Sequence, residues 1–195
     1  MKIFYVHGIG SAGGGNTVDM IKKYFPNDEI YSPDIPVSPI EAFEFIKKES
    51  KDYDLIIGTS LGGFYTMMVS GKFKILINPA INADTEIPSS IGMGEHEFLR
   101  ERISGEKTYT VDETFVKELS FLKERFFKEW FDYEYKSETY GIFGTEDTVV
   151  NDGEEFKEIW WKRNFYEDVF GHRMTEDVFI KTVKPIIETI RKAVS

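Results

Sequence analysis

The chain has 195 residues with 41% hydrophobic and 30% charged residues, no cysteine and a net charge of −10 at pH 7. This composition is typical of a soluble globular domain, and it excludes disulfides and cysteine-ligated metals. The negative charge argues against nucleic acid and anionic membranes as partners, and apolar runs too short for a signal peptide or a membrane span lead us to expect a cytoplasmic protein.

Apolar runs and turn signals, taken in chain order, predict strands that alternate with helices. Strands are expected at 2–6, 29–32, 54–57, 74–77, 139–143 and 164–169, and helices at 18–24, 39–49, 61–70, 112–131, 152–161 and from 175 onward. Ser38 and Glu41 form a capping box around Pro39, Gly71 can end a helix in left-handed geometry, and Pro185 should kink the last helix. The alternation is typical of an α/β protein with a mostly parallel sheet covered by helices on both faces.

One segment, about 84–137, breaks this rhythm because it contains no clear strand. It includes the predicted helix 112–131, on which an apolar stripe follows helical spacing. The stripe consists of Phe115, Leu119, Leu122, Phe126 and Trp130. We expect a helical insertion within a single domain, which either completes the core or covers one end of the sheet like a lid.

A serine lies at the turn after the third predicted strand. The sequence Gly58-Thr59-Ser60-Leu61-Gly62 matches the pattern G-x-S-x-G. Glycines flank the serine in such a turn because the backbone passes too close for a Cβ atom, and the turn holds the serine hydroxyl out over the sheet. Ser60 is therefore a candidate nucleophile, although a glycine-rich turn that only caps the next helix has the same pattern.

A serine nucleophile needs a base, and the base needs an acid that orients it. His172 follows the sixth predicted strand and Asp147 the fifth, so both are expected at the carboxyl edge of the sheet with Ser60. Ser60, Asp147 and His172 also occur in the chain order of α/β-hydrolases. Glu146 is an alternative acid. His7 is an alternative base, although a histidine there more often braces its loop.

The oxyanion of such a reaction needs two backbone donors. The pattern assigns the N–H of Leu61 and, in the loop after the first strand, the N–H of Ile9. We assign His7, Gly8 and Phe64 to substrate binding. The third histidine of the chain, His96, lies between two glutamates and is expected to be solvated.

The loop after the first strand also resembles a dinucleotide fingerprint. Gly8-Ile9-Gly10-Ser11-Ala12-Gly13 matches G-x-G-x-x-G, and Asp34 follows 21 residues after Gly13. Three consecutive glycines at 13–15 delay the helix that would have to meet the pyrophosphate, and Asp34 lies between prolines rather than at a strand end. Nucleotide binding is the weaker hypothesis.

The chain as a whole resembles the α/β-hydrolase superfamily and, more narrowly, the small YqiA-like esterases. The resemblance rests on Val6-His7-Gly8, Pro33-Asp34-Ile35-Pro36, the segment 58–65, Ile77-Asn78-Pro79-Ala80, Gly144-Thr145-Glu146-Asp147 and Gly171-His172. It implies the sheet order 2-1-3-4-5-6 in this chain's strands, and it selects Asp147, three residues after a glycine, as the acid.

The resemblance further implies hydrolysis of small carboxylic esters or thioesters, with neither a cofactor nor a metal. The segment 84–137 matches the family pattern least, so the acyl length and the natural substrate stay open, as does the oligomeric state. A hydrolase-fold protein that only binds a ligand or partner is the alternative to an esterase.

Overall fold

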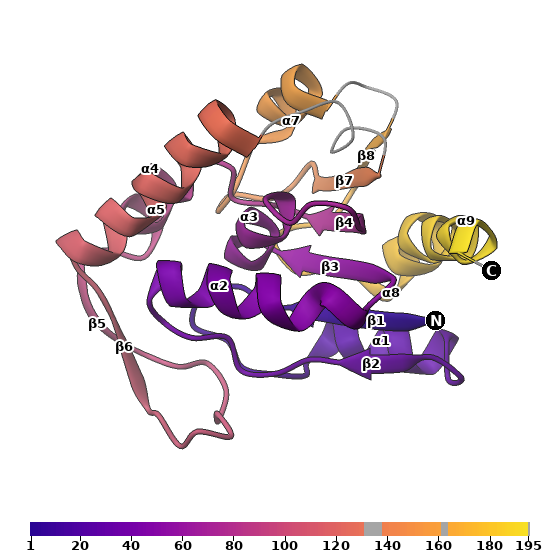
Figure 1. Ribbon diagram of the computed structural model, residues 1–195, viewed down its shortest axis with the longest axis horizontal. Helices are drawn as coiled ribbons and strands as arrows, with labels where there is room; N and C mark the ends of the chain where they lie inside the picture. Colours follow the sequence, from indigo (N-terminus) through magenta and orange to yellow (C-terminus); the bar gives the residue numbers. More distant parts are fainter. Residues whose placement is uncertain (131–137, 161–163, 195) are drawn as a thin grey trace.

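Six parallel strands form the central sheet of the computed structural model, which describes residues 1–130, 138–160 and 164–194. The strands are β1 (Lys2–Val6), β2 (Glu29–Tyr31), β3 (Leu55–Thr59), β4 (Phe73–Ile77), β7 (Thr139–Gly144) and β8 (Phe165–Asp168). Their order is β2-β1-β3-β4-β7-β8 (Figure 1). The six strands and the order implied by the resemblance are confirmed.

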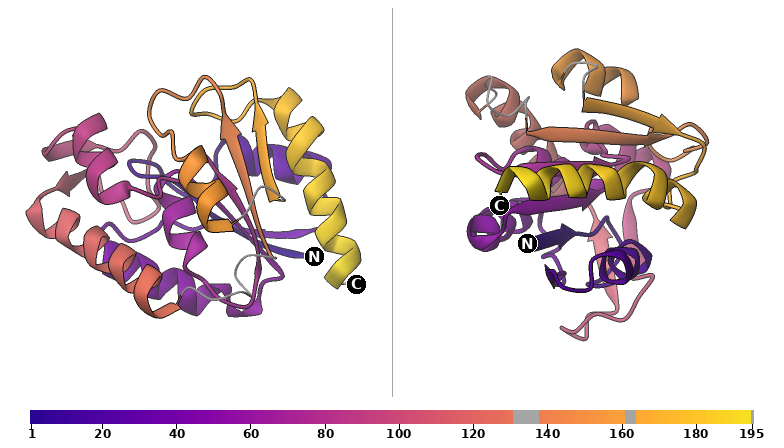
Figure 2. Two further views of the ribbon diagram at one scale, coloured as in Figure 1. Left: turned by 90° about the horizontal axis from the view of Figure 1, so that it is seen from above. Right: turned by 90° about the vertical axis from the view of Figure 1, so that its right-hand side faces the viewer.

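Helices cover both faces of the sheet. The helices are α1 (Asn16–Tyr24), α2 (Pro39–Glu49), α3 (Leu61–Met67), α4 (Ala83–Ser90), α5 (Glu113–Arg125), α7 (Gly153–Trp160), α8 (Glu176–Val178) and α9 (Lys184–Val194), with a 3₁₀ turn at Ser50–Asp52 and π-helical turns at Phe126–Trp130 and Phe179–Val183. Figure 2 shows α1 and α9 on one face and α3, α5 and α7 on the other. The result is a three-layer α/β architecture.

The central strands divide the core into two clusters. Ile56 and Leu76 belong to the cluster under α2, α3, α5 and α7, whereas Ile57 and Ile75 belong to the cluster under α1 and α9. Alternate residues of a strand point to opposite faces, so a strand covered on both sides must be apolar throughout. This is why the apolar runs in the sequence predict these strands well.

Local signals place several helix ends. The hydroxyl of Ser38 accepts a hydrogen bond from the N–H of Glu41 with Pro39 as the first helical residue, which confirms the predicted helix start and the Ser38 cap. Gly71 has a left-handed φ of 65°, as predicted, but α3 ends earlier, at Met67, because the N–H groups of 68 and 69 bond three residues back. A π-helical turn directly precedes α9, whose second residue is Pro185, so the departure from α geometry lies next to the proline.

The prediction of no strand in the insertion is wrong. Gly94–Glu97 (β5) and Thr108–Val111 (β6) pair as an antiparallel hairpin outside the main sheet. Both strands are short. β5 reads Gly-Glu-His-Glu and carries no apolar alternation, while the alternation of β6, Thr-Tyr-Thr-Val, spans only four residues. Residues 83–90 form a helix that the pattern also did not predict.

The rest of the insertion follows the predicted helix. Asp112 caps α5 by accepting a hydrogen bond of 2.8 Å from the N–H of Phe115, and the stripe residues Phe115, Leu119, Leu122 and Phe126 are buried. Residues 131–137 of the predicted insertion, Trp161 of the predicted helix 152–161 and the side chain of Trp130 lie outside the described residues. Among the residues that the structure describes, no helix is long and apolar enough to cross a membrane.

Candidate active site

Ser60 lies on a sharp turn between β3 and α3. Its φ of 55° and ψ of −122° are unusual for a residue with a side chain, and it directly precedes the first residue of α3. Its backbone is held by hydrogen bonds from its N–H to Ile77 O and from the N–H groups of Phe64 and Ala80 to its carbonyl. Because these bonds come both from α3 and from the end of β4 with its following loop, they fix the strained turn in place.

Two glycines of the motif are required by close backbone approach. A Cβ atom on Gly62 would lie 2.2 Å from Val6 O, and one on Gly58 would lie 2.4 Å from Gly62 O. No side chain fits at such distances, so the start of α3 packs directly on the end of β1. The interpretation that these glycines make room for a tight turn is confirmed.

His172 and Asp147 meet at the same edge of the sheet, as the sequence predicts. His172 Nδ1 lies 2.8 Å from Asp147 Oδ2. Burial raises the pKa of Asp147, but the hydrogen bonds from His172 and from the N–H groups of Val149 and Val150 outweigh it, so the pKa lies below its ordinary value. The neighbouring Glu146, the alternative acid, is exposed, and the hydrogen bond to His172 is made by Asp147.

The side chain of Asn78, after β4, ties the two loops of this pair together. Its Nδ2 donates to the carbonyls of Gly171 (3.1 Å) and His172 (3.4 Å), and its Oδ1 accepts from the N–H of Gly144 (2.8 Å). Asn78 is buried and has a φ of 42°. The sequence analysis used the Asn-Pro-Ala segment only for resemblance and did not recognise this role; its partners lie 66 to 94 residues away.

The loop after β1 lies directly against Ser60. A Cβ atom on Gly8 would come within 3.1 Å of Ser60 Cβ and 3.6 Å of Ser60 Oγ. Within the described part of the chain, neither the N–H of Ile9 nor that of Leu61 donates to another protein group. The first N–H groups of a helix have no partner inside it, which accounts for Leu61, and both Leu61 and Ile9 line a cavity.

His7 uses both of its ring nitrogens within the protein. Nε2 accepts a hydrogen bond from the N–H of Ile35 (3.0 Å), so the proton lies on Nδ1, which donates to Gly8 O (2.8 Å). Burial lowers the pKa of His7 to about 4. This neutral histidine braces two loops and has no nitrogen free to take a proton from Ser60.

A narrow cavity opens beside these groups. It is lined by the loop 7–11, the segment 35–37, Leu61 and Tyr65 of α3, and Phe98, Arg102, Tyr109 and Phe115 of the insertion. Its volume of about 30 Å³ is room for about two water molecules. Phe64, which we assigned to substrate binding, has no exposed surface and is packed into the core, because this side of α3 faces away from the cavity.

The loop between β5 and β6, residues 98–107, packs against the loop after β1 and is called the roof. The N–H of Leu99 donates to Gly10 O (2.7 Å), and Arg102 Nη2 donates to Ile35 O (2.8 Å). Asp34 joins the same parts, since its carboxylate accepts from the N–H groups of Gly13 (2.8 Å) and Ile103 (2.6 Å). Asp34 is thus engaged in holding the roof, which removes it from the ribose-binding role that the dinucleotide hypothesis requires.

His96 differs from the prediction that it is merely solvated. It is partly buried, its Nε2 lies 3.1 Å from Gly92 O, and its ring lies 5.5 Å from the ring of Tyr109. The hairpin brings these residues together across its two strands, and the flanking glutamates gave no sign of this pairing.

The chain matches one known protein family. The model of the family described as "Uncharacterised protein family (UPF0227)" matches residues 2–160. A search of curated proteins finds no match.

Solved structures share the fold over nearly the whole chain. They include a monoacylglycerol lipase from Paleococcus ferrophilus (16% identity, 97% of this chain and 93% of that chain, TM-score 0.65) and Est1E from Butyrivibrio proteoclasticus (11%, 98% and 88%, 0.68). A third is the mouse alpha/beta hydrolase domain-containing protein 10 (13%, 97% and 90%, 0.59). The fold is that of the α/β-hydrolases.

Proposed function

Because the chain belongs to the family UPF0227 and has an α/β-hydrolase fold, we propose that it is a serine hydrolase that cleaves small carboxylic esters or thioesters. One observation carries the proposal. A serine on a strained strand–helix turn and a histidine–aspartate pair at 2.8 Å lie on the same edge of one sheet, in the chain order of this fold.

In the proposed mechanism, Ser60 Oγ attacks the ester carbonyl while His172 Nε2 takes its proton. His172 then gives that proton to the leaving alcohol or thiol, and Asp147 holds the imidazole in the tautomer that this exchange needs. The N–H groups of Ile9 and Leu61 stabilise the negative charge on the carbonyl oxygen. Water hydrolyses the acyl-enzyme by the same route.

The substrate-facing surface comes from the loop after β1 and from the insertion. Gly8 allows the loop to approach Ser60, and His7 braces it. The small cavity beside the oxyanion donors favours a short acyl group. We infer a lid-like role for the insertion from the contacts of Phe98, Arg102 and Tyr109 with this cavity.

The test is hydrolysis of 4-nitrophenyl esters from acetate to laurate by the wild type and by Ser60→Ala. We expect turnover on the shortest chains and a loss of about 10⁴-fold or more in the variant. Retention of activity in Ser60→Ala would refute the assignment. An exposed serine, Ser89, provides the matched control variant Ser89→Ala, which should keep full activity.

A binding protein without catalysis is the second candidate, and one observation favours it. Within the described residues, the Ser60 hydroxyl makes no hydrogen bond to His172. In hydrolases without substrate this bond is often long and shortens when substrate binds. Covalent labelling by a fluorophosphonate separates the two: an aligned Ser60 reacts and Ser60→Ala does not, whereas a misaligned Ser60 leaves both unlabelled.

A further inference from the structure

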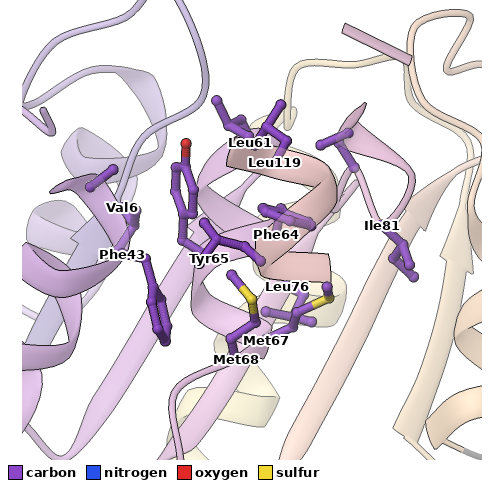
Figure 3. Close-up of a cluster of buried hydrophobic side chains, with 14 of the residues drawn as sticks. Val6, Phe43, Leu61, Phe64, Tyr65, Met67, Met68, Leu76, Ile81 and Leu119 are labelled. Atoms are coloured by element: carbon purple, nitrogen blue, oxygen red, sulfur yellow. The ribbon is translucent and has the colours of Figure 1, made fainter. Parts of the chain in front are cut away.

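The hydroxyl of Tyr65 is buried without a partner. Tyr65 is 2% exposed, and its Oη has no hydrogen-bond partner among the described residues. Figure 3 shows the hydroxyl at the end of the ring beside Leu61, away from Met67 and Met68. Tyr65 and Leu61 both line the cavity, so the side chain that carries this hydroxyl forms part of the cavity wall next to a proposed oxyanion donor.

An unpartnered buried hydroxyl is costly and needs an explanation. Burial and the charge of Glu118 both raise the pKa of Tyr65, so the group stays a neutral phenol that can donate one hydrogen bond and accept others. The carboxylate of Glu118 is engaged elsewhere, accepting from the hydroxyl of Ser38 (2.8 Å) and the N–H of Ile40 (3.2 Å). Since the described protein groups supply no partner, the structure favours one from a group that fills the adjoining cavity.

The charges around the cavity favour a neutral partner over an anion. Arg102 is the cation that lines the cavity. Its Nε lies 2.9 Å from Glu106 Oε2, and its charge also lowers the pKa of Asp34. Two carboxylates thus balance one guanidinium. His7 is neutral with both nitrogens engaged, so it adds no positive charge.

The size of the cavity favours a short group as the partner. Room for about two water molecules corresponds to about two non-hydrogen atoms beyond an ester carbonyl. Resting on the proposed esterase function, we propose that the cavity takes a short hydroxyacyl group whose hydroxyl pairs with that of Tyr65. The enzyme then prefers hydroxyacyl esters to alkanoyl esters of the same size.

The experiment compares phenyl esters in isosteric pairs: glycolate with propionate, and 3-hydroxypropionate with butyrate. The measured quantity is the ratio of kcat/KM within each pair, for wild type and for Tyr65→Phe. Dividing the wild-type ratio by the variant ratio cancels the intrinsic reactivity of the esters. We expect this quotient to be about fivefold or more in at least one pair. A quotient of one in both pairs overturns the inference, because a tyrosine that only binds water predicts that result.

Three controls make each outcome decisive. Tyr65→Phe removes only an unpaired hydroxyl, so thermal unfolding should match the wild type; if it fails to fold, Tyr65→Met is measured instead. Tyr53→Phe, a partly buried tyrosine packed against Phe4, should keep the wild-type ratios. If Tyr109→Phe rather than Tyr65→Phe removes the preference, the assignment to Tyr65 is wrong.

The acyl class and the proposed function fail in different ways. Turnover of all four esters with equal quotients refutes only the hydroxyacyl inference. Turnover of none of them by the wild type, together with no fluorophosphonate labelling, refutes the esterase function and the inference with it. Faster cleavage of phenyl hydrogen malonate than of the hydroxyacyl esters refutes the neutral-partner argument, because that substrate carries a carboxylate.

Discussion

Asn78→Asp tests whether the bridge between the two catalytic loops positions His172. Aspartate tolerates the positive φ of this position about as well as asparagine, and it keeps an acceptor for the N–H of Gly144. It removes both donors, so the carbonyls of Gly171 and His172 lose their partner and face a carboxylate. We expect a loss of about 2–3 kcal/mol in the free energy of unfolding.

The stability loss corresponds to a fall of about 4–12 °C in Tm for a chain of this size. If the bridge also orients His172, kcat falls by about 10- to 100-fold with little change in KM, since a misplaced base impairs the transition state more than binding. The assay is steady-state hydrolysis of a short-chain ester, at least 20 °C below the Tm of each variant, together with the rate of fluorophosphonate labelling.

Asn82→Asp is the matched control. Asn82 also donates from Nδ2, here to Asp152 Oδ1 at 2.9 Å, but among the described residues it makes no hydrogen bond to Gly171 or His172. This variant should lose comparable stability and keep kcat within about twofold. The reasoning is refuted if Asn78→Asp shows the expected fall in Tm while kcat and the labelling rate match those of Asn82→Asp.

Two further predictions concern stability. Gly62→Ala should cost at least about 3 kcal/mol and remove activity, because its Cβ would lie 2.2 Å from Val6 O and 2.6 Å from His7 O. Gly92→Ala, with a φ of 88° but nothing within 4 Å, should cost only about 1–2 kcal/mol; equal losses by thermal unfolding would contradict the steric argument. Burial and the neighbouring Asp152 raise the pKa of Glu86 from 4.5 to about 8. The protonated carboxyl therefore stabilises the folded state fully below pH 4.5, and this stabilisation is lost as the pH rises through 8. Urea unfolding at pH 5 and pH 8.5 measures this effect. Between the two pH values, the free energy of unfolding of Glu86→Gln should rise by about 2 kcal/mol relative to that of the wild type, a figure reduced because Glu86 is partly exposed. The same pH dependence in both proteins would contradict the prediction.

The sequence predicts the sheet well because its central strands are buried on both faces. Strands such as Leu55–Thr59 and Phe73–Ile77 are apolar at nearly every position, with Thr59 and Lys74 as exceptions, and that run is visible without any tertiary information. The turn at Ser60 is equally visible, since the glycines at 58 and 62 reflect local sterics. The proximity of His172 and Asp147 follows from strand order, because the carboxyl ends of parallel strands share one edge.

Features that depend on distant partners were not predicted. The bridge from Asn78 joins residues up to 94 positions apart, and the unpaired state of Tyr65 is a property of its surroundings rather than of its neighbours in sequence. The hairpin β5–β6 was missed because β5 has no apolar pattern and the pattern of β6 is only four residues long. The prediction that Phe64 contacts the substrate was wrong by one residue, since the next residue of α3, Tyr65, lines the cavity and Phe64 packs in the core.

The attachment of the roof has a consequence for how new specificities arise. The hydrogen bonds that hold it come from the main-chain N–H groups of Leu99, Ile103 and Gly13, and every residue except proline has such a group. Side chains at Phe98 and Tyr109, which line the cavity, are therefore exchangeable without releasing the loop from Asp34 and Gly10. Random libraries at these two positions should yield variants with altered acyl preference at little cost in folding, and natural divergence has the same route open to it.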